Sequence, residues 1–215
     1  MPTSDTSDRP THPNQPSRTL VLGGARSGKS AYAEELAQAL AGSGPVRYVA
    51  TSRRGTGDQD WEQRVTAHRD RRPDTWTTVE TAHHLDLAEQ LRSPADAGAT
   101  LVDDLGTWLT LELDGASAWD LPRGTITPRT DALVSSVRGY DGALILVTPE
   151  VGLGVIPETR SGRLFRDEIG ALNARLAQIC DRVVLVVAGL PMTLKDAPTD
   201  QVRGTEVSTR TRGLA

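Results

Sequence analysis

One cysteine, Cys180, is the whole thiol content of this 215-residue chain, which also lacks any long hydrophobic run. A single thiol cannot form an internal disulfide, and the first residues lack the apolar core of a signal peptide, so we expect a cytoplasmic protein. The net charge is −4, which leaves no excess of basic residues to attract nucleic acid. We therefore expect no nucleic-acid partner and no insertion into a membrane.

The overall composition suits one soluble domain. Hydrophobic residues make up 37% of the chain and charged residues 24%, and the length is sufficient for a sizeable core. Residues 1–17 are polar and rich in proline, and residues 196–215 are similarly polar, so both are predicted to be flexible tails. The predicted nucleotide-binding domain spans residues 18–195.

The most informative segment is a glycine loop between a predicted buried strand, residues 19–22, and a predicted helix, residues 30–40. Glycines allow backbone N–H groups to close around phosphate oxygens, and the helix N-terminus adds the positive end of its dipole. In such a P-loop Lys29 reaches the β- and γ-phosphates and Ser30 ligates Mg²⁺. A Gly-Lys-Ser turn that merely starts a helix is the less favoured interpretation. The loop comprises Gly23, Gly24, Ala25, Arg26, Ser27, Gly28, Lys29 and Ser30.

Further apolar runs alternate with helical stretches along the chain. Continuous apolar runs are typical of strands buried on both faces, which predicts an α/β, P-loop NTPase-like fold with a largely parallel sheet and helices on both faces. Residues 114–128 carry glycine and proline interruptions and are predicted to be a surface excursion. The predicted strands are residues 46–50, 76–79, 100–102, 143–147 and 183–187.

Two adjacent acids follow the apolar strand at residues 99–102. An acid at the carboxyl end of a strand lies on the crevice where α/β proteins bind ligands, and in the Walker B position it holds Mg²⁺ directly or through water. The other role available is the N-cap of the helix predicted over residues 105–113. We assign Asp103 to the metal and Asp104 to the cap.

The segment 64–73 combines a histidine with closely spaced arginines. His68 shares one face of a predicted helix with apolar residues, which taken alone favours a partly buried structural histidine. Arg69, Arg71 and Arg72 favour a different role, because guanidinium groups near a phosphate stabilise the charge that develops during transfer. His68 then becomes a candidate nucleophile at phosphorus, since imidazole forms a labile phosphoramidate.

These features belong to an ordered series of motifs. The series resembles the family of bifunctional adenosylcobinamide kinases/adenosylcobinamide-phosphate guanylyltransferases of cobalamin synthesis, over about residues 19–195. The resemblance implies a kinase step on the aminopropanol arm of a corrinoid, then conversion of that phosphate to a GDP derivative through a GMP-histidine intermediate. The motifs are residues 23–30, 48–52, 64–73 with Trp76 and Glu80, 101–103, 150–157, 165–167 and 185–191.

The resemblance also assigns site residues. It makes the glycine loop the phosphate site, with Lys29 catalytic, and makes His68 the guanylylated nucleophile. The substrates implied are GTP, ATP and adenosylcobinamide or its phosphate, with Mg²⁺ as cofactor held by Ser30 and Asp103. Other positions that match the nucleotide site of the family are Ala50, Thr51, Ser52, Arg69, Asp70, Arg71, Arg72, Glu80 and Asp103.

The chain departs from the family pattern at two positions. Pro149 and Leu111 stand where many relatives have asparagine, and each removes an amide available to a substrate or a neighbouring subunit. Residues 150–157 are either a structural turn or a substrate loop, and the resemblance favours the loop. The resemblance further implies a homotrimer with sites near subunit interfaces.

Two other functions are compatible with a P-loop. One is a kinase of another small alcohol, in which His68 is structural, and the other is a nucleotide-binding regulator without chemistry. A preference for guanine comes only from the resemblance, because the chain has no Asn-Lys-x-Asp element. The chain also has no cluster of cysteine and histidine for a metal, so the resemblance implies that the corrinoid itself holds the cobalt.

Overall fold

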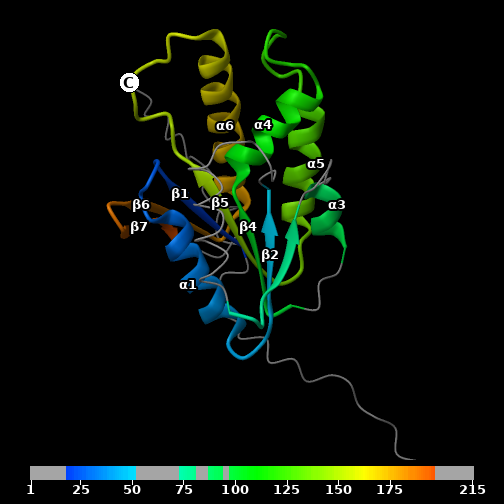
Figure 1. Ribbon diagram of the computed structural model, residues 1–215, viewed down its shortest axis with the longest axis vertical. Helices are drawn as coiled ribbons and strands as arrows, with labels where there is room; N and C mark the ends of the chain where they lie inside the picture. Colours follow the sequence, from blue (N-terminus) through cyan, green and yellow to red (C-terminus); the bar gives the residue numbers. More distant parts are fainter. Residues whose placement is uncertain (1–17, 52–72, 81–86, 94–96, 197–215) are drawn as a thin grey trace, which may run out of the picture.

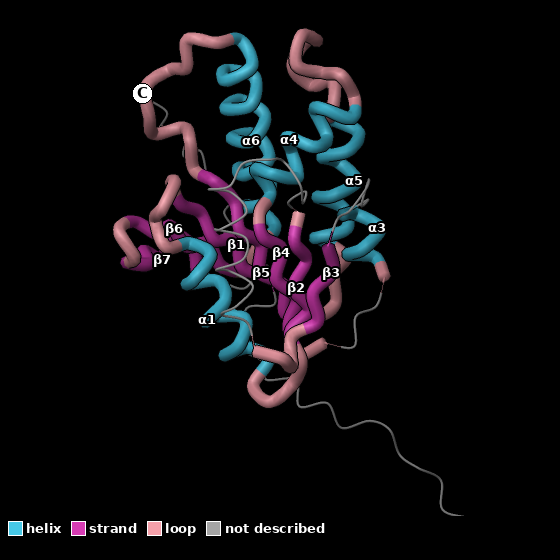
Figure 2. The backbone as a smooth tube through the Cα atoms, viewed as in Figure 1, coloured by secondary structure: helices cyan, strands magenta, loops and turns pink. Residues whose placement is uncertain are grey.

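A seven-stranded sheet organises the chain, in the strand order β3-β2-β4-β5-β1-β6-β7 (Figures 1 and 2). The computed structural model describes residues 18–51, 73–80, 87–93 and 97–196. Strands β1 to β6 are mutually parallel, and β7 pairs antiparallel with β6. The strands are β1 (Arg18–Gly23), β2 (Val46–Ala50), β3 (Thr77–Glu80), β4 (Ala99–Asp103), β5 (Ala143–Pro149), β6 (Arg182–Val187) and β7 (Leu190–Asp196).

Helices cover both faces of the sheet, which confirms the predicted α/β class. Side chains of β1 alternate between two apolar cores: Leu20 and Leu22 pack with the helices of one face, and Val21 packs with α1 on the other. In Figure 1 α1 lies in front of the sheet, while α4, α5 and α6 lie behind it and extend beyond its upper edge. The helices are α1 (Lys29–Ala41), α3 (Leu87–Arg92), α4 (Leu105–Gly115), α5 (Thr127–Arg138) and α6 (Arg160–Ile179).

The sheet differs from the predicted set of strands at its two edges. Strand β3 begins one residue later than expected, and Trp76 instead packs its ring 6.2 Å from that of Tyr48. Strand β7 was not predicted, because it contains a proline and is almost wholly exposed, so its sequence, LPMTLKD, lacks a continuous buried apolar run. Its last residue, Asp196, lies one position beyond the predicted end of the domain.

The predicted surface excursion over residues 114–128 is shorter than expected and is anchored. Helix α4 ends at Gly115 and α5 begins at Thr127, and Ala118 and Ile126 between them are buried. The guanidinium of Arg160 on α6 also donates hydrogen bonds to backbone carbonyls of this connection, at Trp119 and at Leu121. The connection is therefore fixed against the first turn of α6.

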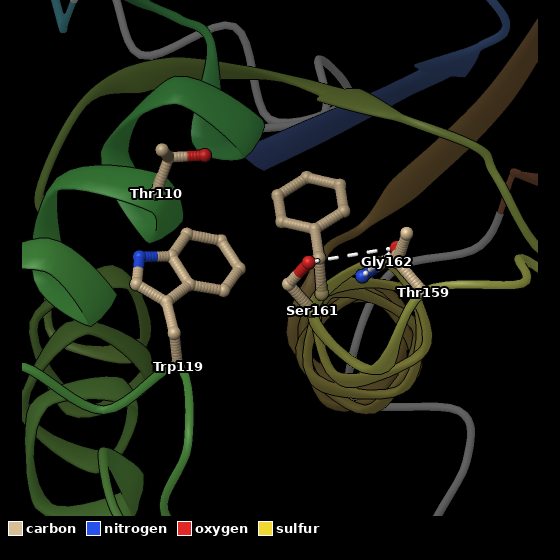
Figure 3. A pocket seen from close by; sticks show the side chains of 6 residues that line it. Thr110, Trp119, Thr159, Ser161 and Gly162 are labelled. Carbon is tan, nitrogen blue, oxygen red and sulfur yellow. Dashed lines mark hydrogen bonds between the residues drawn. The ribbon is translucent and has the colours of Figure 1, made fainter.

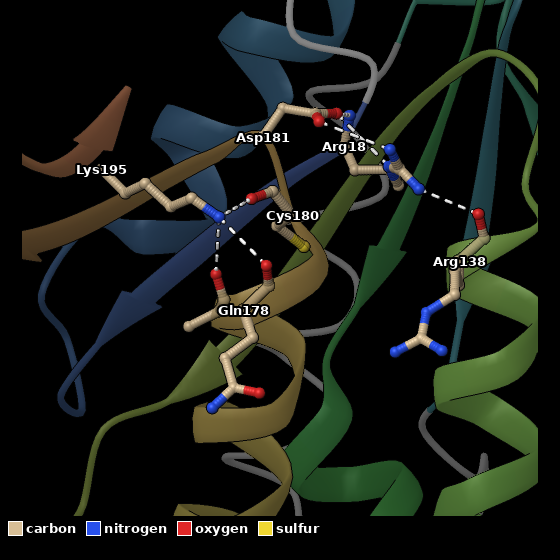
Figure 4. Close-up of polar contacts among 7 residues, drawn as sticks. Arg18, Arg138, Gln178, Cys180, Asp181 and Lys195 are labelled. Carbon is tan, nitrogen blue, oxygen red and sulfur yellow. Dashed lines mark hydrogen bonds and ion pairs between the residues drawn. The ribbon is translucent and has the colours of Figure 1, made fainter. Parts of the chain in front are cut away.

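A cluster of polar contacts lies at the end of the sheet opposite the glycine loop (Figure 4). The Lys195 ammonium on β7 donates hydrogen bonds at the end of α6, to the carbonyl of Gln178 in its last turn (3.1 Å) and to that of the C-cap residue Cys180 (2.6 Å). Arg18 and Asp181 form an ion pair at 3.3 Å beside them. A cation at the carboxyl end of a helix satisfies carbonyl groups that have no partner within the helix. These contacts hold β7 and α6 to the start of β1.

Candidate functional site

The carboxyl ends of the parallel strands lie along one edge of the sheet, where the predicted site residues gather. Ala50, the last residue of β2, lies opposite Glu80 on β3 and opposite Asp103 on β4. Since neighbouring strands lie about 4.8 Å apart, these three positions form one short row. The glycine loop begins at Gly23, the last residue of β1, on the same edge.

The glycine loop has a conformation that requires glycine at two positions. A Cβ added to Gly23 would lie 2.4 Å from Ser27 Oγ and 2.9 Å from the Val186 carbonyl oxygen. Gly28 has φ +91°, in the region that favours glycine, and its Cα faces Gly189. The Gly189 N–H donates a 2.8 Å hydrogen bond to the Ser27 carbonyl. The loop is thus pressed against the turn between β6 and β7.

Lys29 begins α1 and folds back over the loop. Its Nζ donates to the Gly24 carbonyl at 3.4 Å, and its backbone N–H donates to Ser27 Oγ at 3.3 Å. The first turn of α1, a fully described helix, carries no acidic residue that would oppose the positive end of its dipole. An ammonium, a helix N-terminus and a glycine loop at one place form an anion site suited to phosphate.

Two hydroxyl groups converge on the carboxylate at the end of β4. Ser30 Oγ donates to Asp103 Oδ1 at 3.2 Å, and the Tyr48 hydroxyl donates to Asp103 Oδ2 at 2.7 Å. Hydroxyl and carboxylate oxygens are the hard ligands that Mg²⁺ prefers, and such sites usually complete the shell with water and substrate phosphates. The residues present therefore fit a magnesium ion beside the glycine loop. Tyr48 was expected only as part of a motif.

The two adjacent acids have different surroundings. Asp104 Oδ1 accepts a 2.8 Å hydrogen bond from the Thr107 N–H, which confirms Asp104 as the N-cap of α4. Asp103 points instead to Ser30 and Tyr48, at the position predicted for the metal-linked acid. The buried Thr51 braces both backbones: its N–H donates to the Asp103 carbonyl, and its hydroxyl donates to the Asp104 carbonyl.

The end of β5 lies between the glycine loop and α4. Glu150 N–H donates to the Gly23 carbonyl at 3.1 Å, so the segment after β5 touches the start of the glycine loop. Pro149 packs against the first turn of α4, where a Cβ added to Gly106 would lie 2.6 Å from the proline Cγ. At this position the family resemblance predicts an asparagine in many relatives, whereas here the ring of Pro149 packs on the helix.

Several predicted site residues lie outside the described part of the chain. Glu80 is described, at the exposed end of β3, two strands away from Asp103. The predicted site residues outside the described part are Ser52, His68, Arg69, Asp70, Arg71 and Arg72, together with the apolar face expected beside His68.

The helices of the described segments include none that is long and apolar enough to cross a membrane.

Comparison with known proteins identifies close relatives. Residues 19–194 match the family described as cobinamide kinase / cobinamide phosphate guanyltransferase. A bifunctional adenosylcobalamin biosynthesis protein, CobP of Pseudomonas aeruginosa, is 45% identical over 84% of this chain and 99% of its own length. The corresponding CobU proteins of Salmonella typhimurium and Escherichia coli are 39% and 34% identical, each over 82% of this chain and 98% of their own length.

A solved structure supports the fold alone. An ATPase from the type III secretion system of pathogenic bacteria superposes with a TM-score of 0.51 at 12% identity, covering 82% of this chain and 56% of that one. The likeness confirms the predicted P-loop NTPase-like architecture. Together with the family match over most of the chain, the glycine loop and the acid at the end of β4 place this protein in the cobinamide kinase / cobinamide phosphate guanyltransferase family.

Proposed function

We propose that this chain carries out both reactions of its family on one nucleotide site: phosphorylation of adenosylcobinamide, then transfer of GMP from GTP to the resulting phosphate. The observation that carries the proposal is the hydrogen bond from Ser30 of the glycine loop to Asp103 at the end of β4. This pair joins the phosphate-binding element to the acid that a P-loop enzyme uses with its metal ion. A glycine loop that only starts a helix has no need of such a partner.

In the kinase step the hydroxyl of the aminopropanol arm attacks the γ-phosphorus of ATP or GTP. The hydroxyl oxygen forms the new P–O bond, its proton is released to solvent, and the bond to the nucleoside diphosphate breaks so that the diphosphate leaves. Lys29 and the N–H groups of the glycine loop stabilise the charge on the transferred group. Mg²⁺, held by Ser30 and Asp103, supplies further neutralisation of the phosphates when bound.

In the second step His68 serves as nucleophile. Its imidazole nitrogen attacks the α-phosphorus of GTP and pyrophosphate leaves, which gives a GMP-histidine. The phosphate of adenosylcobinamide phosphate then attacks the same phosphorus and releases the imidazole. Family membership and the arginines beside His68 support this role. Neutralisation of phosphate charge falls to Arg69, Arg71 and Arg72. The other residues that line the nucleotide site are Ala50, Thr51, Ser52, Asp70 and Glu80.

The assembly proposed for this protein is a cytoplasmic homotrimer. An exposed apolar row supports association between copies: Leu190, Met192 and Leu194 on β7 are 72%, 56% and 56% exposed, next to the exposed Val187. Contiguous exposed apolar side chains of this kind mark contact surfaces. Light scattering of the purified protein should give three times the mass of one chain, and Met192→Glu should reduce that mass. A monomeric wild type would contradict the trimer.

Incubation with GTP labelled at the α-phosphate tests the function directly. Acid-labile and base-stable label on His68 supports the guanylyltransferase. Phosphorylation of an alcohol without protein label would instead favour a plain kinase, and binding without either reaction would favour a regulator. Adding adenosylcobinamide phosphate to the labelled protein should move the label into adenosylcobinamide-GDP, which identifies the acceptor.

A further inference from the structure

An open groove of about 570 Å³ lies between α4 and the first turns of α6. Figure 3 shows Thr110 and the indole of Trp119 on one side, and Ser161, Gly162 and Thr159 on the other. None of the lining residues carries a charge, and two of them are aromatic. The lining residues are Thr110, Trp119, Thr159, Ser161, Gly162 and Phe165.

Each side of the groove is reached along a segment that starts at the edge of the sheet where the glycine loop lies. Thr110 lies six residues after the Asp104 cap, so it is about 9 Å along α4 from the edge of the sheet. The other wall is reached through residues 150–157, which begin where the Glu150 N–H donates to the Gly23 carbonyl. Groups bound in the groove and at the glycine loop can therefore belong to one large molecule.

Hydrogen bonds from α6 hold residues 150–157, the segment that connects the glycine loop to the groove. Arg166 of α6 donates to the Gly152 carbonyl at 2.8 Å, and Arg163 donates to the Pro157 carbonyl at 3.0 Å. Between these anchors the side chains of Leu153, Val155 and Ile156 are 82%, 94% and 67% exposed. An apolar surface thus extends along the segment that leads from the glycine loop to the groove.

We propose that this groove binds part of the corrin end of the substrate while the aminopropanol arm reaches the glycine loop. The inference rests on the proposed function and adds a binding site to it. A corrinoid presents a broad apolar ring system with neutral amide side chains, which matches uncharged aromatic walls bordered by hydroxyl groups. The exposed apolar residues of the connecting segment extend the contact beyond the groove itself. Phosphates find no counter-charge among the lining residues.

Two substitutions in the groove and one outside it test the inference. Phe165→Ala removes an aromatic wall, and Ser161→Trp fills the groove from an exposed position at the start of α6. Ser135→Trp is the matched control, because Ser135 is exposed on α5 and does not line the groove. Calorimetric titration with adenosylcobinamide measures corrinoid affinity, and a fluorescent GTP analogue measures nucleotide affinity.

We expect the two groove variants to bind adenosylcobinamide at least about tenfold more weakly than wild type, with GTP affinity changed by less than about twofold. The control should match wild type for both ligands. Unchanged corrinoid affinity in both groove variants would overturn the groove assignment and leave the proposed function intact. Weaker GTP binding with unchanged corrinoid binding would assign the groove to the nucleobase instead. A wild type that binds GTP but no corrinoid would overturn the proposed function, and the groove assignment with it.

Discussion

Ser30 Oγ donates a hydrogen bond to Asp103 Oδ1 at 3.2 Å, although the two residues are 73 positions apart. Ser30 lies in the first turn of α1, and Asp103 is the last residue of β4. Strand β5 separates β4 from β1 in the sheet, so Ser30, which follows β1, and Asp103, which ends β4, do not come from neighbouring strands. Their side chains meet at the edge of the sheet that is formed by the carboxyl ends of the strands.

Lys29→Ala should reduce the rates of both reactions by at least about 100-fold, because the ammonium stabilises phosphate charge in both transition states. Phosphorylation of adenosylcobinamide and formation of adenosylcobinamide-GDP would be assayed separately. Lys195→Ala is the matched control, since Lys195 contacts the carboxyl end of α6 at the opposite end of the sheet. It should lower the melting temperature without abolishing turnover. Wild-type rates in Lys29→Ala would contradict the P-loop assignment.

Asp103→Asn and Asp104→Asn should have different effects, although the residues are adjacent. Asp103→Asn removes the carboxylate charge from the proposed magnesium site. The Mg²⁺ concentration needed for half-maximal activity should therefore rise, and turnover should fall. Asp104→Asn keeps a side-chain oxygen for the Thr107 N–H and should cost about 1 kcal/mol or less of stability. Metal titration and thermal melting distinguish the two variants. The reverse pattern would mean that their roles are exchanged.

His68→Ala should separate the two chemistries. The variant should form neither the GMP adduct nor adenosylcobinamide-GDP, because it lacks the proposed nucleophile. Phosphorylation of adenosylcobinamide, which needs no histidine nucleophile, should stay within about tenfold of wild type. His83→Ala provides a control for loss of a histidine outside the proposed machinery. Normal production of the GDP derivative by His68→Ala would indicate direct attack by the corrinoid phosphate on GTP.

Cys180 should be inert in the folded protein. Burial raises the pKa of its thiol from 9.0 to about 12, against a smaller opposing effect of Arg18. Because the folded state holds this proton more tightly, the corresponding stabilisation is present below pH 9.0 and is lost as the pH rises toward 12. A thiol reagent at pH 8 should label Cys180 only after denaturation. Rapid labelling of the native protein would contradict the buried position.

Local sequence determined much of the fold and part of the site. The strands near residues 19–22 and 100–102, the helix after the glycine loop and the Asp104 cap were all predicted, because each depends on residues only a few positions apart. The same holds for Lys29 and Ser30, whose spacing within the glycine loop suffices to predict a phosphate site. Family membership was also predicted from motifs that are short and contiguous.

Tertiary structure decided the contacts between distant segments. The Tyr48 hydroxyl reaches Asp103, Pro149 packs on Gly106, and β7 adds an antiparallel strand to β6. Local apolar periodicity indicates that a segment is a strand, but it does not give the order in which strands pair. That order is set by how the whole set of apolar faces is buried, so only the folded chain brings Ser30 to Asp103 and opens a groove between α4 and α6.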